Sequence, residues 1–191
     1  MNEQIQRWDE RFARGHELHG YEPSAPLPDA VAGIPAGLAL DLGCGAGRHA
    51  IWLAERGWRV HAIDGSEVGV GLLLAEARRR SVRERITARI ADLEAPGFTL
   101  EPEQYDLVCD FYFLHRPLFA EIRRAVRPGG LFIAAIHVEG GPTAGHFLLA
   151  PGELPALVES WQWKLLSFRE GDSQESGHRH QTVEIVAQRP A

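Results

Sequence analysis

Apolar and polar positions alternate along this chain in a way that predicts strands and helices in turn. Short apolar runs of strand length are separated by stretches whose apolar residues recur at helical spacing. The predicted strands cover residues 38–42, 59–63, 86–91, 105–111 and 131–137, and the predicted helices cover residues 48–56, 66–80 and 118–126. This alternation is typical of a parallel sheet with helices on both faces, so we expect an α/β fold.

The pattern changes at both ends of the chain. After the fifth strand we expect a glycine-rich loop at 139–145, a helix at 152–160, strands at 162–168 and 182–188, and a polar connection at 170–179 that forms a loop or hairpin turn. Before the first strand lie a leader that carries Arg and aromatic residues (1–22) and a connector rich in Pro and Ala (23–35) with at most one short helix. Residues 127–130, Arg-Pro-Gly-Gly, predict a turn into the fifth strand.

Composition narrows the class of protein. With 191 residues and 45% hydrophobic content, the chain is long enough for one well-buried domain and too short to suggest two. No stretch approaches the roughly 18 apolar residues of a membrane span, so we expect neither export nor insertion, and a cytoplasmic protein. The formal net charge of −6 argues against broad attraction to nucleic acid. The two cysteines, Cys44 and Cys109, lack metal-ligand spacing, and no metal is expected.

The chain contains a cluster of basic residues despite its negative net charge. Five arginines lie at or just beyond the end of the predicted helix at 66–80, where cations complement the negative end of the helix dipole: Arg78, Arg79, Arg80, Arg83 and Arg85. We interpret them as a solvated helix terminus rather than a binding patch.

The glycines after the first strand are the main chemical signal. The segment reads Asp41-x-Gly43-x-Gly45-x-Gly47, and Arg48 stands where a dinucleotide fingerprint has its third glycine. It also lacks the Gly-Lys-Ser/Thr ending of a P-loop. Alternate glycines allow the backbone to approach a ligand at successive points, because each lacks a Cβ atom.

With these motifs the chain resembles the class I S-adenosylmethionine-dependent methyltransferases. Asp41 to Gly47 is similar to the first motif of that family, and Asp64, at the end of the second strand, is placed like the acid that binds both ribose hydroxyls. Ala91-Asp92-Leu93 is placed like the motif whose acid meets the adenine amino group, although an Asp after a strand also forms turns. Asp106 and the Arg-Pro-Gly-Gly turn also fit, with Asp106 expected to be structural.

The resemblance implies a doubly wound, mostly parallel sheet of seven strands in one domain, residues 1–191. It divides the chain into a leader or lid (1–35), a cofactor-binding half (36–137) and a substrate-side half (138–191). The implied cofactor is S-adenosylmethionine. Its expected site comprises Trp8, Arg11, Asp41, Gly43, Cys44, Gly45, Gly47, Asp64, Gly65, Ala91, Asp92, Leu93 and Asp110.

Two further stretches resemble the narrower group of tellurite-resistance and related small-molecule methyltransferases. They are Trp8 to Phe12, followed by Tyr-Glu-Pro at 21–23, and Phe113 to Phe119. In that group the leader folds over the cofactor, so Trp8 and Arg11 are expected to help close the site. An ordinary amphipathic helix, in which Trp8 and Phe12 pack four residues apart, explains the two aromatic residues equally well but leaves Arg11 unexplained.

Two histidine-arginine pairs are the candidate catalytic residues. His115 and Arg116 follow the fourth strand and are expected near the methyl group, with a solvated helix start before Pro117 as the other interpretation. The narrower group places a similar pair near residues 178 and 179, which makes His178 and Arg179 candidates for handling substrate. His178 and His180 alone are too few ligands for a zinc site, and an exposed loop explains them as well.

The predicted activity is methyl transfer to a small molecule such as a chalcogen oxyanion or a thiol. An in-line displacement needs alignment more than a catalytic group, and His115 or His178 can accept a proton where the acceptor carries one. The rival prediction is a binding module that holds the cofactor without turnover. A nucleic-acid methyltransferase lacks support, because Cys-Asp-Phe-Tyr at 109–112 stands where an Asn-Pro-Pro-Tyr-like motif is expected. A nicotinamide oxidoreductase is the least favoured alternative, because Arg48 stands where the dinucleotide fingerprint has its third glycine. The sequence leaves the oligomeric state open.

Overall fold

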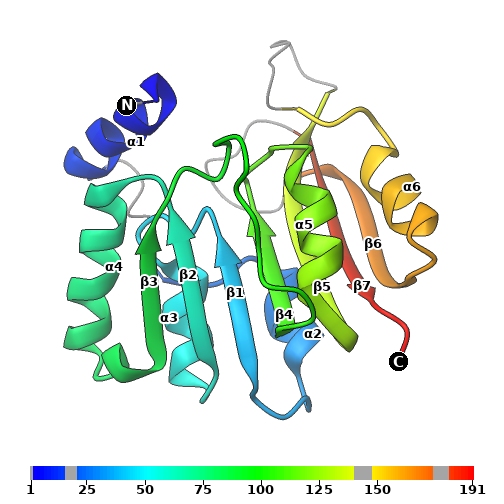
Figure 1. Cartoon of the computed structure of the whole chain (residues 1–191), viewed down its shortest axis with the longest axis horizontal. Coiled ribbons are helices and arrows are strands. Elements are labelled where there is room, and N and C mark those ends of the chain that lie inside the picture. Colours follow the sequence, from blue (N-terminus) through cyan, green and yellow to red (C-terminus); the bar gives the residue numbers. More distant parts are fainter. Residues whose placement is uncertain (1, 16–20, 140–147, 174–180) are drawn as a thin grey trace. The chain divides into compact units, whose positions relative to one another are not determined.

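The computed structural model describes residues 2–15, 21–139, 148–173 and 181–191. The helices are α1 (Glu3–Ala13), α2 (Pro26–Val31), α3 (Arg48–Glu55), α4 (Glu67–Arg79), the 3₁₀ turn η1 (Arg83–Arg85), α5 (Leu118–Ala125) and α6 (Glu153–Ser160). The strands are β1 (Leu38–Leu42), β2 (Arg59–Asp64), β3 (Ile86–Ile90), β4 (Tyr105–Phe111), β5 (Val126–Val138), β6 (Lys164–Asp172) and β7 (Gln181–Gln188). Figure 1 labels them.

The seven strands follow the order β3-β2-β1-β4-β5-β7-β6. The pairs β1–β2, β2–β3 and β4–β5 are parallel, and β7 runs antiparallel to both β5 and β6. The predicted fold class, a mostly parallel α/β sheet of seven strands, is therefore confirmed. No helix among the described residues is long and apolar enough to cross a membrane.

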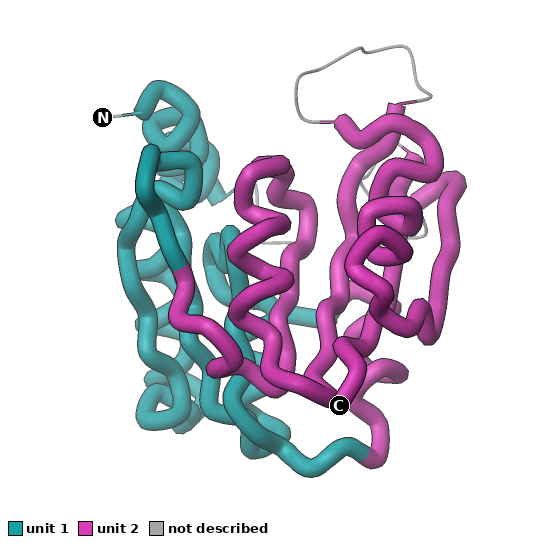
Figure 2. Tube along the Cα trace, turned by 45° about the vertical axis from the view of Figure 1, so that its right-hand side comes forward, with its two compact units in different colours: residues 1–23, 34–99 teal, residues 24–33, 100–191 magenta. Residues whose placement is uncertain are grey.

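Contacts divide the chain into two compact units, coloured in Figure 2. The first unit comprises residues 1–23 and 34–99 and holds β1 to β3 with α1, α3 and α4. Its core follows the apolar runs of the sequence, since Leu40, Leu42, Ile51 and Leu53 are all fully buried. α4 begins at Ser66, whose hydroxyl accepts a hydrogen bond from the Gly69 amide at 2.9 Å and caps the helix.

The second unit comprises residues 24–33 and 100–191 and holds β4 to β7 with α2, α5 and α6. In Figure 1, α5 and α6 lie in front of these strands and α2 lies behind them, so helices cover both faces. This explains why residues 131–136 of β5 are buried without alternation, as is usual for a strand covered on both sides. The single-domain prediction stays a prediction.

The strand and helix predictions agree closely with the structure, with two differences in the second unit. β5 begins at Val126 rather than Leu131, so residues 127–130 are not a separate turn before the strand. They form an irregularity inside it, because Tyr105 of β4 pairs with Val126 while Leu107 pairs with Leu131.

The second difference concerns β6, which was expected at 162–168. It begins at Lys164 and continues to Asp172, so the first residues of the expected polar connection belong to a strand. Pairing with β7 extends it, since Glu170 and Asp172 lie opposite Val183 and Gln181. Cross-strand pairing of this kind depends on β7 and is invisible in the local sequence of β6.

Candidate functional site

The glycine loop after β1 makes a tight turn into α3. Its three glycines have positive φ angles, 62° at Gly43, 50° at Gly45 and 86° at Gly47. The Gly47 amide donates to the Cys44 carbonyl at 2.8 Å, and Gly47 is the N-cap of α3. Side chains other than glycine rarely adopt this conformation, so the alternate glycines are a requirement of the turn itself. The turn brings its main chain to the carboxyl end of β1, where open α/β sheets bind ligands.

Asp64 fastens this loop to the end of β2. Its two carboxylate oxygens accept hydrogen bonds from the amides of Gly45 and Ser66, each at 2.7 Å. Burial raises the pKa of Asp64, and these backbone hydrogen bonds act in the opposite direction. The carboxylate thus stands at the carboxyl edge of β2, beside the glycine loop, where the sequence places it.

Asp41 is buried inside β1, with 1% of its surface exposed. Its carboxylate accepts a hydrogen bond from the Ala50 amide at 3.0 Å, in the first turn of α3. Burial raises the pKa of Asp41 to about 7, and the nearby Asp64 carboxylate adds to the shift. Cys44 is buried as well, and burial raises the pKa of its thiol, so this side chain packs as a neutral thiol.

The third strand contributes Ala91, Asp92 and Leu93 just beyond its end. The Ala91 amide donates to the Asp64 carbonyl at 2.9 Å, which holds this segment beside β2. One oxygen of Asp92 accepts from the Glu94 amide at 2.9 Å, as in a turn-forming Asp. The other accepts from the Asn2 side chain at 3.3 Å, which also donates to Glu94. Both interpretations of Asp92 thus keep support, because the turn leaves the carboxylate at the strand end.

Helix α1 packs directly on the glycine loop. A methyl group on Gly45 would come within 2.8 Å of the Phe12 ring, and one on Gly65 within 2.7 Å of Ile5. Asp9 accepts hydrogen bonds from the Ser66 hydroxyl at 2.5 Å and from the Val68 amide at 3.2 Å. α1 is therefore attached at the positive N-terminus of α4 as well as along the loop.

Trp8 and Arg11 lie on this helix in contact with each other. The Arg11 guanidinium stacks over the Trp8 ring at 4.6 Å from its centroid, and the Trp8 and Phe12 rings are 5.7 Å apart. The amphipathic packing of Trp8 with Phe12 is therefore present. Arg11, which that packing left unexplained, joins it through its stacking on Trp8.

The other candidates belong to the second unit or lie outside the described residues. Asp110 is buried in β4, and His115 lies in the turn before α5. Arg116 binds Glu153 through two hydrogen bonds, at 2.6 and 2.8 Å, and the Leu148 carbonyl at 3.1 Å. This pairing raises the pKa of the Arg116 guanidinium and links the turn before α5 to the start of α6. His178 and Arg179 are outside the described residues.

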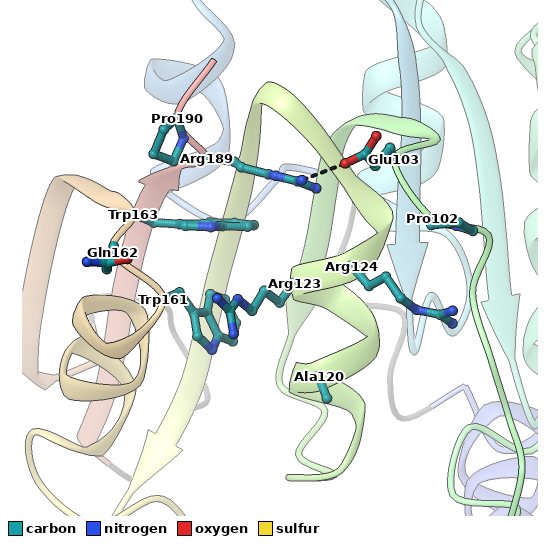
Figure 3. Close-up of a pocket in the computed structure, with 10 residues that line it drawn as sticks. All are labelled: Pro102, Glu103, Ala120, Arg123, Arg124, Trp161, Gln162, Trp163, Arg189 and Pro190. Carbon is teal, nitrogen blue, oxygen red and sulfur yellow. Dashed lines mark hydrogen bonds and ion pairs between the residues drawn. The ribbon is translucent and has the colours of Figure 1, made fainter.

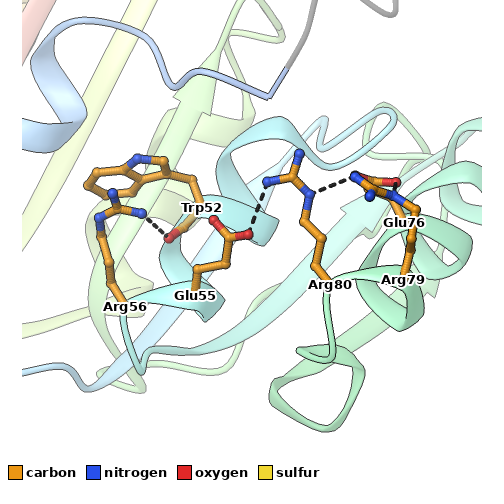
Figure 4. Close-up of polar contacts among 6 residues, drawn as sticks. All are labelled: Trp52, Glu55, Arg56, Glu76, Arg79 and Arg80. Carbon is orange, nitrogen blue, oxygen red and sulfur yellow. Dashed lines mark hydrogen bonds and ion pairs between the residues drawn. The ribbon is translucent and has the colours of Figure 1, made fainter.

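Two arginines of the cluster at the end of α4, Arg79 and Arg80, form ion pairs, drawn in Figure 4. Arg79 and Arg80 both bind Glu76, and Arg80 also reaches Glu55 on α3 at 3.0 Å. Arg56 stacks on Trp52 of the same helix, 3.6 Å from the ring centroid. For Arg79 and Arg80, these contacts favour the interpretation as a helix terminus whose charges are met by the protein.

A hollow of about 650 Å³ lies in the second unit and is drawn in Figure 3. Its lining comes from the segments before β4 and β6, from α5 and from the end of β7: Pro102, Glu103, Ala120, Arg123, Arg124, Trp161, Gln162, Trp163, Arg189 and Pro190. Arg189 binds Glu103 across it at 2.6 Å. None of the predicted site residues lines this hollow, because it lies at the amino ends of β4 and β6.

Residues 39–130, which include the glycine loop, Asp64 and Asp92, match the model of a family described as a methyltransferase domain. Over these residues the chain is similar to a methyltransferase domain. This region begins in β1 and ends within β5.

Curated relatives extend the likeness beyond the domain. A ubiquinone biosynthesis O-methyltransferase of Pseudomonas aeruginosa is 32% identical over 139 residues, which are 69% of this chain and 58% of the relative. Hemagglutinin 1 of Eikenella corrodens is 28% identical over 165 residues, 81% of this chain and 53% of that protein. The chain thus spans little more than half the length of these two relatives.

Solved structures show the same fold. TehB from Haemophilus influenzae superposes with a TM-score of 0.76 at 20% identity, over 95% of this chain and 67% of TehB. A Burkholderia thailandensis 1,6-didemethyltoxoflavin-N1-methyltransferase, solved with bound 1,6-didemethyltoxoflavin and S-adenosylhomocysteine, gives a TM-score of 0.73 at 20% identity, over 98% of this chain and 88% of that one.

Three side chains that pack at the candidate site were missed by the sequence reasoning. Asn2, Ile5 and Asp9 contact the ends of β3 and β2 and the start of α4, but none was among the expected site residues. Ile5, Asp9 and Phe12 share one face of α1 with Trp8 at spacings of three and four residues. This periodicity is visible in the sequence and indicates a packed helix, although it does not say against what the helix packs.

Proposed function

We propose that this chain transfers a methyl group from S-adenosylmethionine to a small-molecule acceptor. One observation carries the proposal: the Asp64 carboxylate stands 2.7 Å from the Gly45 amide, so an acid and a bare main-chain turn meet at the end of β2. The match of residues 39–130 to a methyltransferase domain supports the same activity. The superposition with a methyltransferase solved with S-adenosylhomocysteine supports the choice of cofactor.

The residues present fit this cofactor. Each Asp64 oxygen accepts one backbone hydrogen bond in the structure, and a carboxylate oxygen has two acceptor sites, so both can also accept a ribose hydroxyl. Glycines at 43, 45 and 47 supply the positive φ angles of the turn that brings main chain to the end of β1. We assign further contacts to Asp41 and Asp92, and closure of the site to Trp8 and Arg11 on α1. The bound cofactor supplies an electrophilic methyl group.

We propose a chalcogen oxyanion, a thiol or a similar small molecule as the acceptor. The formal net charge of −6 offers little attraction for a nucleic acid. An in-line displacement requires the acceptor to be aligned and partly desolvated. It does not require a catalytic side chain. Where the acceptor carries a proton, His115 is the described side chain assigned to accept it, and His178 and Arg179 remain candidates for handling substrate.

Binding of the cofactor is tested by calorimetry with S-adenosylmethionine on the native chain and on Asp64→Ala and Asp64→Asn. Hydrogen bonds to a charged group contribute about 1.5–3 kcal/mol each, so losing two ribose contacts should weaken binding about 100-fold or more. Asp29→Ala removes an exposed carboxylate on α2 and should leave the affinity unchanged. Circular dichroism verifies that the Asp64 variants are folded. Native affinity in folded Asp64→Ala would remove the proposed ribose anchor.

Transfer is tested separately, with radiolabelled cofactor and a panel of chalcogen oxyanions, thiols and amines. Label appearing on one acceptor class, together with release of S-adenosylhomocysteine, supports the proposed activity. Tight binding of the cofactor with no transfer to any acceptor of the panel contradicts it and favours a binding module. Failure of both assays rejects the cofactor itself.

A further inference from the structure

The hollow in the second unit is lined by hydrogen-bond donors that have no acceptor among the described residues. Its volume of about 650 Å³ is typical of small-molecule sites. Trp161, which ends α6, and Trp163, which precedes β6, both line it, although only 7% and 8% of their surfaces are exposed. Neither indole N–H donates to any residue that the structure describes, and neither nitrogen is fully enclosed. Because a buried tryptophan usually has an acceptor for this group, both N–H groups can serve a ligand.

Three arginines also line the hollow, and the protein compensates the charges of only two of them. Arg189, just after β7, binds Glu103 at 2.6 Å. Arg124, on α5, binds Glu121 at 2.5 Å. Arg123, its neighbour on the same helix, forms no ion pair or hydrogen bond within the described part of the chain. The hollow therefore presents one positive charge that no described carboxylate matches.

The donors come from separate elements and meet in this hollow. In Figure 3 the Arg123 side chain extends from α5 toward Trp161. The rings of Trp161 and Trp163 are 5.1 Å apart and inclined at 67°, so their planes form a corner. Ala120 and Pro190 add apolar surface to the lining. One cation, two N–H donors and an apolar lining suit a ligand that carries a single anionic group on an apolar body.

We propose that this hollow binds a small organic carboxylate. A carboxylate carries the one negative charge that Arg123 can match, and its two oxygens fit the fork of a guanidinium. Its further acceptor sites can take the indole N–H groups. A phosphate monoester carries nearly two negative charges at neutral pH, more than Arg123 alone can match. No residue assigned to the cofactor or to the methyl acceptor lines the hollow, so the proposal does not rest on the proposed activity.

Binding is measured by NMR titration of the ¹⁵N-labelled native chain with benzoate and with hexanoate. The chain has five tryptophans, and each gives one indole N–H signal. The carboxylates should shift two of these signals and leave the other three in place. Trp161→Phe and Trp163→Phe identify the two signals, because each variant lacks one of them. Benzamide has the shape of benzoate without its charge and should bind about 10-fold more weakly.

The contribution of the unmatched charge is tested with Arg123→Gln. Benzoate should bind this variant about 10-fold more weakly, because a neutral amide replaces the charged donors. Arg127→Gln is the matched control: this exposed arginine of the same unit binds Asp106 and does not line the hollow, so the affinity should stay unchanged. Thermal unfolding verifies that both variants are folded.

Four results would overturn this proposal. They are carboxylates that shift neither the Trp161 nor the Trp163 signal, benzamide that binds as tightly as benzoate, folded Arg123→Gln with native affinity, and inorganic phosphate that shifts the same two signals at lower concentration than benzoate. Cofactor binding and methyl transfer are measured in separate assays, so a failure here is distinguishable from a failure of the proposed function.

Discussion

The aspartates around the glycine loop of the first unit are bonded differently from two surface glutamates of the second unit. In the first unit, Asp9, Asp41 and Asp64 accept hydrogen bonds from backbone amides near helix starts and the glycine loop. In the second unit, carboxylates bind arginines at the surface, as Glu153 does with Arg116, at 2.6 Å, and Glu184 with Arg169, at 2.7 Å.

This difference affects how much acceptor capacity each acid retains. A carboxylate bound by backbone amides retains acceptor capacity for a hydroxyl or an ammonium group, whereas a surface carboxylate paired with a guanidinium is already matched in charge. The two kinds of carboxylate also differ in their effect on the stability of the fold. A buried carboxylate without a cation destabilises the fold when ionised, and an exposed ion pair contributes little in either direction.

The largest expected effect on the free energy of unfolding comes from the ionisation of Asp41. Its pKa is about 7 in the folded chain against 3.8 for an unperturbed carboxyl, so the folded state holds the proton longer than the unfolded state does. Stability should therefore fall as pH rises from about 4 to about 7, by on the order of 4 kcal/mol from this group, and level off above that range.

Asp41→Asn isolates this contribution, because its amide oxygen can still accept from Ala50 but cannot ionise. Denaturant unfolding of both chains is measured from pH 4 to pH 8. The expected difference in free energy of unfolding grows in favour of the variant as pH rises to about 7. Other groups cancel in this difference, including His49, whose pKa is lowered by burial. If the free energy of unfolding of the two chains changes with pH in the same way, burial of Asp41 does not affect the pH dependence of stability, and the contrast drawn for the first unit fails.

A smaller effect on stability is expected at the contact between α1 and the glycine loop. Phe12 is buried against Gly45 and Gly69, and Phe12→Ala should destabilise the chain by about 3 kcal/mol through the cavity it leaves. Hydrogen exchange of the α1 amides should accelerate in parallel. Ile34→Ala, at a half-exposed position, provides the control and should cost less than about 0.5 kcal/mol. Equal effects from the two substitutions would mean that α1 is not anchored by Phe12.

The smallest effect is expected from the surface ion pairs, including those of the first unit in Figure 4. Hydrogen bonds from Arg79 and Arg80 lower the pKa of Glu76 to about 2. Because this folded pKa lies below the unfolded value, the stabilisation is present above about pH 4.5 and is lost as pH falls toward 2. Screening by solvent limits it, so Glu76→Gln should cost about 1 kcal/mol or less at neutral pH, and 1 M salt should reduce that cost further.

Arg124→Gln in the second unit is the matched comparison for that pair. Its guanidinium binds Glu121 at 2.5 Å, also on one helix at a spacing of three residues. The two variants should behave alike in thermal unfolding at low and high salt. A cost several times larger at either position would show that surface pairing differs between the units.

Much of the fold and of the site could be predicted from the sequence because its signals are local. The strand β1, the start of α3 at Arg48 and the cap of α4 at Ser66 are where periodicity, glycine and capping preferences place them. The turn at 43–47 requires positive φ angles, so its glycines are visible without any tertiary information.

The features that sequence reasoning missed depend on contacts between distant segments. β6 extends to Asp172 because β7 pairs with it, and Asn2 meets Asp92 across 90 positions of the chain. The engagement of Arg116 by Glu153 is another such contact, since the two residues lie 37 positions apart. Propensity and spacing carry no information about which distant side chain a residue will meet.

The sequence by itself determined the order of strands and helices, the glycine turn and the acids that end β1, β2 and β3, because each depends on a few neighbouring residues. Only the tertiary structure decided that α1 packs on that turn through Ile5, Asp9 and Phe12, and that side chains from α5, from the end of β7 and from the turn before β6 line one hollow. The physical reason is that burial and hydrogen-bond partners are properties of packed surfaces, which form only when distant parts of the chain meet.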